Sequence, residues 1–476
     1  MEQKKKVVVL GAGIGGLSAG YFLAKTGKYE VTVLEKAPVI GGLCASFEYN
    51  NFTLDYGAHK IYSVIPGVLA EIGTLMADRL LTLPKKNRLF LRGHLVDYPL
   101  KLGNLAGVLG LATFLKLGFG YAFELARGFV RRQPPDSYAG YMIQRFGRPA
   151  YELVFEPLAD KVWGEPSSLH PEMARARVPA SGGMEVILKL LGIKKETAET
   201  NAEFFYYPEK GFGDFPEAMK EYIEETGGRV LLNVDVRELV QAVQADGKIT
   251  AIRGTADGSP AEFESDYVVS SIPLTSLGCL VFGEKDMAFL GSVEDLQFRH
   301  LVLVYVFANR SLVLEDQWIF LPEREYLFSR IFEQKQMNPD LGPANQTAIC
   351  CDFTCDEDSW EWKATDGELA EKTIDGLVNA GFIEPDEVTG YLVKRTQNFY
   401  PRYDLGYVEK MHKVNRHLRV VKNLLLTGRI GMYNYNNSDH CVDMGRFIAD
   451  NLAKGDEPVN IWNDLDKRVA DYKIVD

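Results

Sequence analysis

Three glycines near the start of the chain, spaced as GxGxxG, limit the fold more than any other feature of the sequence. Gly11, Gly13 and Gly16 stand between an apolar run typical of a buried parallel strand and a segment of helical periodicity. The first glycine permits a tight turn, the second lets the backbone approach a pyrophosphate, and the third allows close packing of the helix. Glu35 ends the next apolar run, close to the expected spacing of about 20 residues for a carboxylate that accepts ribose hydroxyls. With Gly15 in the same turn, these residues predict a βαβ unit that binds a dinucleotide.

Later segments are predicted to return to the same sheet. Residues 214–225 have the pattern of a helix, and residues 229–240 and 267–272 have that of strands. A last strand is predicted at residues 423–427. A turn at Gly428 follows it, and then a helix at residues 441–452.

A second domain is predicted from segments that lack glycine fingerprints. Residues 83–99 alternate around Arg92 and Gly93 and indicate a hairpin, and residues 104–200 are mainly helical in pattern. Four β-rich runs indicate an antiparallel sheet. They lie at residues 301–307, 326–332, 347–353 and 390–395.

Charge and cysteine content exclude several classes of protein. The net charge is -12 and the pI is about 5.3, so we expect no binding to nucleic acid, and an anionic substrate would need a local group of arginines. The six cysteines are scattered without CxxC spacing, which favours a reducing cytoplasm over a zinc site or a secreted disulfide framework. No histidine pattern suggests a metal, and glycines interrupt the apolar run after Lys4–Lys6 where a signal peptide would continue. We therefore predict a cytoplasmic protein without a metal.

The segment at residues 104–132 is unusually apolar, with Lys116 and Glu124 as its only charges before Arg127. Its longest uncharged stretch falls short of the roughly 20 apolar residues that a transmembrane helix needs. We expect a helix or helix pair buried in the second domain. The alternative is a monotopic face through which the protein contacts the inner side of a membrane.

Residues after Glu35 carry a second signature. It resembles that of the superfamily of amine oxidases, protoporphyrinogen oxidases and UDP-galactopyranose mutases, in which the cofactor is FAD. The glycine pair would pass close to the pyrophosphate, and the turn that ends in His59 would lie beside the flavin ring. The matching residues are Lys36, Gly41, Gly42, Asp55, Gly57, Ala58 and His59.

Two later segments agree with this resemblance. Val236 lies where such proteins contact adenine through backbone groups, and residues 268–273 (VVSSIP) resemble the strand that returns toward the flavin. The resemblance implies an α/β fold in which a Rossmann-like FAD-binding domain of the GR2 type is interleaved with a substrate domain of antiparallel sheet and helices. The FAD-binding domain would take residues 1–75, 205–285 and 400–476, and the substrate domain residues 76–204 and 286–399.

The segment GRIGMYNYNNSDH at residues 428–440 resembles UDP-galactopyranose mutases in particular. By this resemblance Gly428 and Arg429 would meet the FAD pyrophosphate, while Asn437 and Asp439 at the start of a helix would organise the ribityl and phosphate contacts. Tyr433 would lie near the substrate, and Tyr435 matches the tyrosine that contacts the substrate diphosphate.

Three further stretches resemble the substrate site of these mutases. The KVWG segment contains Trp163 and leads to Arg177, the FSRIFEQK segment contains Arg330, and a tyrosine-proline step begins at Tyr400. The arginines would provide guanidinium forks for a nucleotide diphosphate, and Trp163 would stack on its base or sugar.

Three functions follow from these resemblances. In the mutase reading, FAD reduced by NAD(P)H or another reductant attacks the anomeric carbon of a nucleotide sugar, and His59, Arg177, Arg330 and Tyr435 assist. In the second reading, oxidised FAD takes a hydride from an amine or a hydrophobic substrate, with Lys335 as a candidate for the lysine that amine oxidases hold near the flavin. A noncatalytic flavin-binding scaffold is the third. The mutase reading is the one we favour from the sequence.

Overall fold

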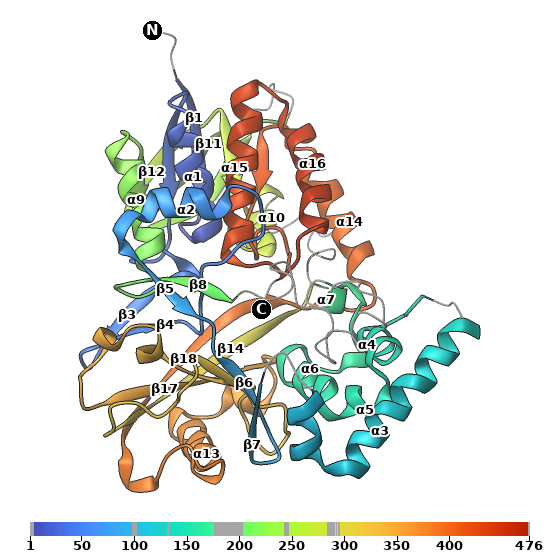
Figure 1. Ribbon diagram of the computed structural model, residues 1–476. Helices are drawn as coiled ribbons and strands as arrows, with labels where there is room; N and C mark the ends of the chain where they lie inside the picture. Colours follow the sequence, from blue (N-terminus) through green and yellow to red (C-terminus); the bar gives the residue numbers. More distant parts are fainter. Residues whose placement is uncertain are drawn as a thin grey trace.

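Two β-sheets face each other across the middle of the protein (Figure 1). The computed structural model describes residues 4–97, 102–130, 134–175, 203–241, 247–282, 291, 293 and 296–474. In the view of Figure 1 a sheet flanked by helices forms the upper part, a larger sheet forms the lower part, and a group of helices lies along the lower right.

The upper sheet is parallel, as predicted. Its order explains the apolar run at residues 7–10 in β1, because a central parallel strand is buried on both faces. The strands, in order across the sheet, are β19 (Leu424–Leu426), β13 (Tyr267–Ser270), β1 (Lys5–Leu10), β2 (Tyr29–Leu34) and β9 (Arg229–Leu231). Their carboxyl ends point toward the middle of the molecule, where ligands of such sheets bind.

Two helices from opposite ends of the chain cover this sheet side by side. They are α1 (Ile14–Lys25) and α15 (Ser438–Lys454). A Cβ at Gly445 would lie only 2.6 Å from the backbone nitrogen of Ala19, so the helices can approach this closely only with glycine there. Helix α9 (Asp214–Glu225) has the bounds that the sequence predicted and also packs on α1.

The predicted continuation of β9 is wrong. The chain leaves the parallel sheet at Asn233, which adopts a positive φ of 54°, and enters a separate antiparallel sheet. The sequence reading missed the hairpin in this sheet, whose turn at Asp257 and Gly258 has positive φ at both positions. The three strands are β10 (Val234–Gln241), β11 (Ile249–Ala256) and β12 (Ser259–Glu264).

The lower sheet is antiparallel throughout except where β15 pairs with β6. The strand predicted at residues 326–332 begins only at Arg330, and β15 was not predicted. The strands in order are β18 (Val388–Pro401), β14 (Phe298–Ala308), β17 (Thr347–Cys355), β16 (Arg330–Glu333), β15 (Trp318–Phe320), β6 (Asn87–Leu91) and β7 (His94–Asp97). The predicted hairpin is confirmed as β6 and β7, joined by Arg92 and Gly93 at φ 52° and 76°.

Strand β14 shows how this sheet is buried on two sides. Leu301, Leu303 and Tyr305 pack in the core shared with the parallel sheet, whereas Val302 and Val304 pack in a second core under α13 (Asp366–Asn379). Because side chains alternate along a strand, one face of the lower sheet is left for the space between the two sheets.

Shorter elements connect and cover the sheets. A two-stranded ribbon of β5 (Leu80–Pro84) and β8 (Phe204–Pro208) runs between the upper and lower parts in Figure 1. The others are β3 (Ser46–Tyr49), β4 (Phe52–Asp55), α2 (Val68–Met76), α10 (Leu274–Phe282), α12 (Trp360–Lys363), α14 (Tyr407–Leu418) and α16 (Pro458–Ala470).

The helical prediction for residues 104–200 is confirmed as far as the structure describes them. The helices are α3 (Leu102–Val130), α4 (Tyr138–Phe146), α5 (Arg148–Ala150), α6 (Glu156–Trp163) and α7 (Glu172–Arg175). The expectation that α3 is buried is wrong: only 11% of its most apolar part is buried. The expectation that it is too short to span is also wrong, since Gly107–Gly128 is long and apolar enough by length and composition, with a mean hydropathy of 1.4.

Candidate active site

A cavity of about 420 Å³ lies between the carboxyl ends of the parallel strands and the lower sheet. Its wall on one side is the glycine turn after β1, the end of β2 and the segment after β19. On the other side it is formed by β14, β15, β16 and β18. Most of the predicted cofactor residues line it, namely Gly11, Gly13, Gly15, Glu35, Gly41, Gly42, Gly57, Ala58, His59, Gly428, Arg429 and Asn437.

Protein atoms hold the glycine turn on one side, and its other side is open to the cavity. The hydroxyl of Ser271 lies 3.0 Å from the carbonyl of Leu10 and 3.2 Å from that of Gly11, which fixes the turn. A Cβ at Gly16 would lie 1.9 Å from the Gly11 carbonyl, so Gly16 serves helix packing and does not line the cavity. A Cβ at Gly13 would meet nothing within 4 Å. The backbone at Gly13 is therefore bare on the side of the cavity.

Close backbone contacts bring the two ends of the chain together at this turn. A Cβ at Gly15 would lie 2.7 Å from the Cα of Gly428, so these two glycines touch backbone to backbone. Gly41 and Gly42 both have positive φ, and a Cβ at Gly42 would lie 3.4 Å from the Cα of Gly13. Side chains at these positions would fill the space beside the start of α1.

Glu35 lies at the cavity with its carboxylate already oriented. Its two oxygens accept hydrogen bonds from the backbone N–H groups of Ala12, at 2.7 Å, and Ala37, at 2.8 Å. Two neighbouring predictions are not supported by position. The Lys36 side chain is exposed and pairs with a carboxylate on β10, and Val236 does not line the cavity.

His59 is a buried, neutral side chain at the cavity wall. Its ring stacks on Phe212 at a centroid distance of 4.7 Å. Burial, helped by the positive charges of Arg330 and Arg429, lowers the His59 pKa to about 3. Its Nδ1 atom is buried without a hydrogen-bond partner among the described residues, so the site offers one unsatisfied imidazole nitrogen.

Asp55 is part of the flavin signature but lies behind the cavity wall. Its buried carboxylate accepts hydrogen bonds from the hydroxyls of Ser46, at 2.6 Å, and Tyr207, and from the N–H of Phe212 at 3.1 Å. Burial raises the pKa of Asp55. The residue ties β4 to β8 and thereby holds the turn that carries His59.

Arg429 lies among aromatic rings. Its guanidinium donates two hydrogen bonds, of 2.9 and 2.6 Å, to the carbonyl of Asn436. The same group lies over the rings of Phe399, Tyr400 and Tyr435 at 5.5, 5.2 and 5.7 Å. The predicted residues Tyr400 and Tyr435 therefore meet at the cavity with a cation held between their faces.

Two predicted substrate residues support this group from behind. Trp163 is buried and its ring meets the Tyr435 ring edge-on at 6.0 Å. The hydroxyl of Tyr433 lies 2.6 Å from the carbonyl of Gln297 and 2.8 Å from that of Arg402. Neither Trp163 nor Tyr433 lines the cavity.

The two predicted diphosphate-binding arginines have different outcomes. Arg330 lines the cavity from β16, and its Nε donates to the Asp352 carboxylate at 2.7 Å. Asp352 therefore fixes the orientation of the guanidinium and offsets part of its charge. Arg177 lies outside the described residues.

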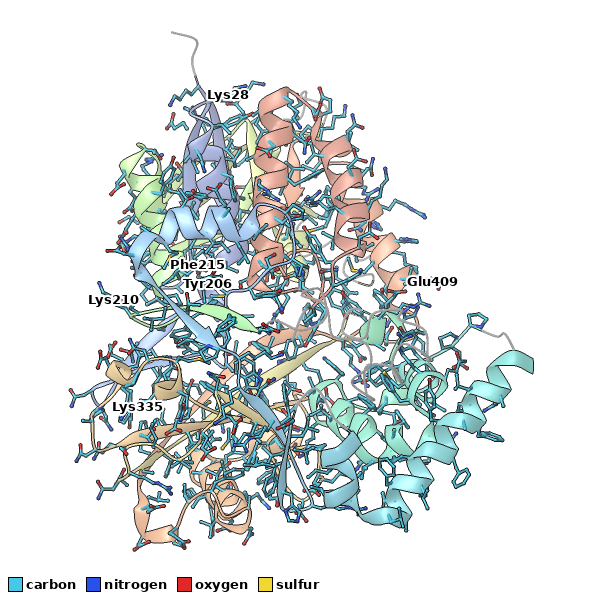
Figure 2. All side chains as sticks on the ribbon, in the orientation of Figure 1. Lys28, Tyr206, Lys210, Phe215, Lys335 and Glu409 are labelled. Carbon is cyan, nitrogen blue, oxygen red and sulfur yellow. The ribbon has the colours of Figure 1, made fainter. Side chains whose placement is uncertain are left out.

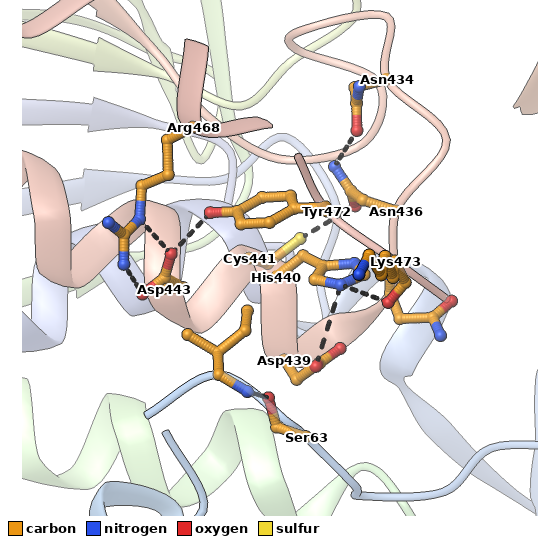
Figure 3. Close-up of polar contacts among 12 residues, drawn as sticks. Ser63, Asn434, Asn436, Asp439, His440, Cys441, Asp443, Arg468, Tyr472 and Lys473 are labelled. Carbon is orange, nitrogen blue, oxygen red and sulfur yellow. Dashed lines mark hydrogen bonds and ion pairs between the residues drawn. The ribbon is translucent and has the colours of Figure 1, made fainter. Parts of the chain in front are cut away.

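The start of α15 is held by polar contacts of His440 (Figure 3). The N–H of Asn437 donates to Nδ1 of His440 at 3.0 Å, and the Nε2 of that ring lies 3.2 Å from the Lys473 carbonyl. The ring of Tyr472 stacks on His440 at 4.4 Å. Asp439 lies in the first turn of α15 but does not line the cavity.

Several cavity residues were missed in the sequence. Lys60 follows the flavin signature directly, and its ammonium lies 5.8 Å from the centroid of the Trp318 ring. Lys335, the lysine proposed for an amine oxidase, lies elsewhere, with its ammonium bonded to the carbonyls of Ser311, Pro343 and Gln346 (Figure 2). The missed lining residues include Lys60, Leu301, Trp318, Phe320, Gln397, Asn398, Phe399 and Ile474.

Comparison with known proteins gives one family. A family model described as flavin containing amine oxidoreductase matches residues 14–438. The 15-cis-phytoene desaturase of Synechococcus elongatus is 23% identical over 337 residues, which cover 66% of this chain and 68% of that protein. The coproporphyrinogen III oxidase of Staphylococcus aureus is 23% identical over 267 residues, which cover 50% of this chain and 55% of that protein.

Solved structures agree on the fold. A reduced UDP-galactopyranose mutase superposes with a TM-score of 0.83 at 19% identity, over 99% of this chain and 100% of the mutase. A putrescine oxidase variant superposes with a TM-score of 0.65 at 15% identity, over 95% of this chain and 99% of the oxidase. The α/β fold with a Rossmann-like sheet and a mixed substrate sheet is thus the fold of these flavoenzymes.

Proposed function

The chain belongs to the flavin-containing amine oxidoreductase family and is an FAD-dependent enzyme; from this premise we propose that it interconverts the pyranose and furanose forms of a nucleotide sugar. The cavity residues fit FAD. The bare backbone at Gly13 and the start of α1 suit the pyrophosphate, Glu35 suits the ribose, and the unpaired Nδ1 of His59 suits a polar edge of the ring.

One observation carries the proposal: several polar and cationic side chains line the cavity. Lys60, Arg330, Gln397, Asn398 and Tyr435 all line it. A hydrocarbon substrate would displace water from these groups and offer them no hydrogen bond, which is unfavourable. A sugar diphosphate would pair with the cations and accept hydrogen bonds from the amides and the phenol.

In this proposal the chain's own residues bind and orient the substrate. When bound and reduced, FAD supplies the nucleophile for the anomeric carbon, and NAD(P)H or another reductant keeps it reduced. Lys60 and Arg330 hold the diphosphate leaving group, with the Arg330 guanidinium oriented by Asp352. Tyr435 donates a hydrogen bond to a phosphate oxygen. The neutral His59 ring places no positive charge beside the flavin.

A second candidate is oxidation or desaturation of an amine or a hydrophobic compound. The match to a phytoene desaturase and the apolar cavity residues Leu301, Phe320 and Phe399 favour it. In that reaction the oxidised flavin would be consumed in each turnover and oxygen or another acceptor would restore it. The two candidates thus differ in whether there is net oxidation.

An activity assay with variants tests the proposal. The holoenzyme, reduced by dithionite, is incubated with UDP-galactose and other nucleotide sugars, and pyranose and furanose products are separated by chromatography. Lys60→Met should raise KM at least about tenfold, since it removes a charged contact to phosphate of about 1.4 kcal/mol or more. Lys36→Met is the matched control, because its exposed side chain lies away from the cavity. Equal KM values for both variants would contradict the assigned role of Lys60.

A further inference from the structure

Helix α3 lies at the rim of the molecule in Figure 1, and among the described residues it packs against α4, α5 and β7. The packed face is tight. A Cβ at Gly120 would lie 2.4 Å from the Pro149 ring, and one at Gly147 would lie 2.7 Å from the backbone nitrogen of Tyr121. Glu124 is buried on this face and lies 3.4 Å from Arg127. These contacts fix how α3 is rotated against α4 and α5.

The opposite face presents large apolar side chains to solvent. Leu111, Leu115, Phe119 and Phe123 are 71%, 48%, 72% and 66% exposed. They recur every fourth residue and so form one stripe along the helix. We name these four residues the α3 stripe. In Figure 2 the side chains of this rim helix project away from the rest of the protein.

The residues between the members of the stripe are small or basic. Exposed positions on this face include alanines, Gly118, Lys116 and Arg127, and among the described residues of α3 no exposed position carries an acidic side chain. In a soluble protein, a row of exposed leucines and phenylalanines of this length marks an interaction surface.

The positive charge of this part of the chain indicates an anionic partner. Residues 98–150 contain seven lysines and arginines and two acidic residues, in a chain whose net charge is -12. Lys116 and Arg127 are exposed on α3 itself, and Arg127 also pairs with the buried Glu124. An apolar stripe flanked by cations fits the surface of a bilayer with anionic lipids, where acyl chains take up the apolar side chains and head groups attract the cations.

The packed face determines how the helix would meet the bilayer. A helix that crossed the membrane would have to give up the contacts with Pro149 and expose Glu124 to hydrocarbon, which is costly. A helix lying in the plane of the interface keeps these contacts and buries only the stripe. We propose that the α3 stripe docks the protein in plane on an anionic lipid bilayer, as a monotopic contact.

Vesicle cosedimentation of the FAD-loaded, full-length protein tests this proposal. The protein is mixed with vesicles of phosphatidylcholine alone or with phosphatidylglycerol added. The test variant is Phe119→Glu combined with Phe123→Glu. The matched control is Val420→Glu with Val459→Glu, which adds the same charge at two exposed apolar positions elsewhere, 60% and 45% exposed.

The expected result is binding of the wild type and the control to anionic vesicles, weaker binding at high salt, and a loss of at least about tenfold in partitioning for the Phe119 and Phe123 variant. Flavin absorbance and thermal unfolding equal to the wild type show that this variant is folded. Equal partitioning of the two variants, or no binding of the wild type, would overturn the proposal. A concentration-dependent dimer in sedimentation velocity that the test variant abolishes, with no vesicle binding, would assign the stripe to a second copy of the chain instead.

Discussion

Substitution of alanine for Gly13 or Gly16 separates two roles of the glycine fingerprint, which are cofactor binding and helix packing. At Gly13 the backbone has φ -71° and ψ 170°, which alanine adopts without strain, and no protein atom lies within 4 Å of the new Cβ. The protein without FAD should be as stable as wild type or more stable by about 0.4–1 kcal/mol, because alanine restricts the unfolded chain. The new methyl group would stand where the pyrophosphate approaches, so Kd for FAD should rise at least about tenfold, or about 1.4 kcal/mol.

Gly16→Ala should behave in the opposite way. Its Cβ would lie 1.9 Å from the Gly11 carbonyl and 2.8 Å from the Ser271 hydroxyl. Helix α1 must therefore shift away from the turn, at a cost of about 3 kcal/mol or more in unfolding free energy, beyond the usual range for one added methyl group. The midpoint temperature of thermal unfolding should fall by several degrees.

Fluorescence titration of the deflavinated proteins with FAD gives Kd, and thermal unfolding with and without FAD gives stability. A Gly13→Ala protein that binds FAD normally, or a Gly16→Ala protein that is as stable as wild type, would contradict the roles assigned to these two glycines.

Three other substitutions have defined outcomes. Asp443→Asn removes the buried charge that binds Arg468, which should cost about 3–5 kcal/mol of unfolding free energy at pH 7. Its partners hold the Asp443 pKa below its usual value. The loss of unfolding free energy, measured by urea titration, should therefore be full above about pH 3.9 and shrink as the pH falls further. Because the His59 pKa is lowered to about 3, the unfolded chain binds one more proton than the folded chain between about pH 6.5 and 3. This group alone should therefore lower the unfolding free energy of the wild type by about 1.4 kcal/mol for each pH unit toward acid. His59→Asn should lack that slope, and equal slopes for the two proteins would contradict the prediction. Glu35→Gln replaces one of the two oxygens that accept from the N–H groups of Ala12 and Ala37 by an NH2 donor, and should raise Kd for FAD about tenfold in equilibrium dialysis; an unchanged Kd would remove Glu35 from the ribose site.

The sequence was most informative where backbone geometry is specified by single residues. Gly11, Gly13 and Gly16 have the predicted surroundings, and the hairpin turn at Arg92 was predicted because its alternation is local. The parallel sheet followed from apolar runs that only a strand buried on both faces needs.

Other features depend on partners far along the chain and left no local signal. Asp55 is turned away from the cavity by hydrogen bonds to Tyr207 and Phe212, more than 150 residues later. Lys60 lies in the cavity beside Trp318, a residue far along the chain. The exposure of α3 also could not be read from its composition, since an apolar helix has the same sequence pattern in a core and on a surface.

In the proposed function, the reduced enzyme binds a sugar diphosphate against Lys60, Arg330 and Tyr435, which line the cavity. The most direct measurement is the anaerobic absorbance spectrum of the dithionite-reduced holoenzyme during titration with a panel of nucleotide sugars, with oxygen consumption measured in parallel on amines and porphyrinogens. We expect a saturable spectral change with a nucleotide sugar only in the reduced state, and no oxygen consumption with the amines and porphyrinogens. Turnover of the oxidised flavin by an amine or a porphyrinogen, without any response to nucleotide sugars, would contradict it.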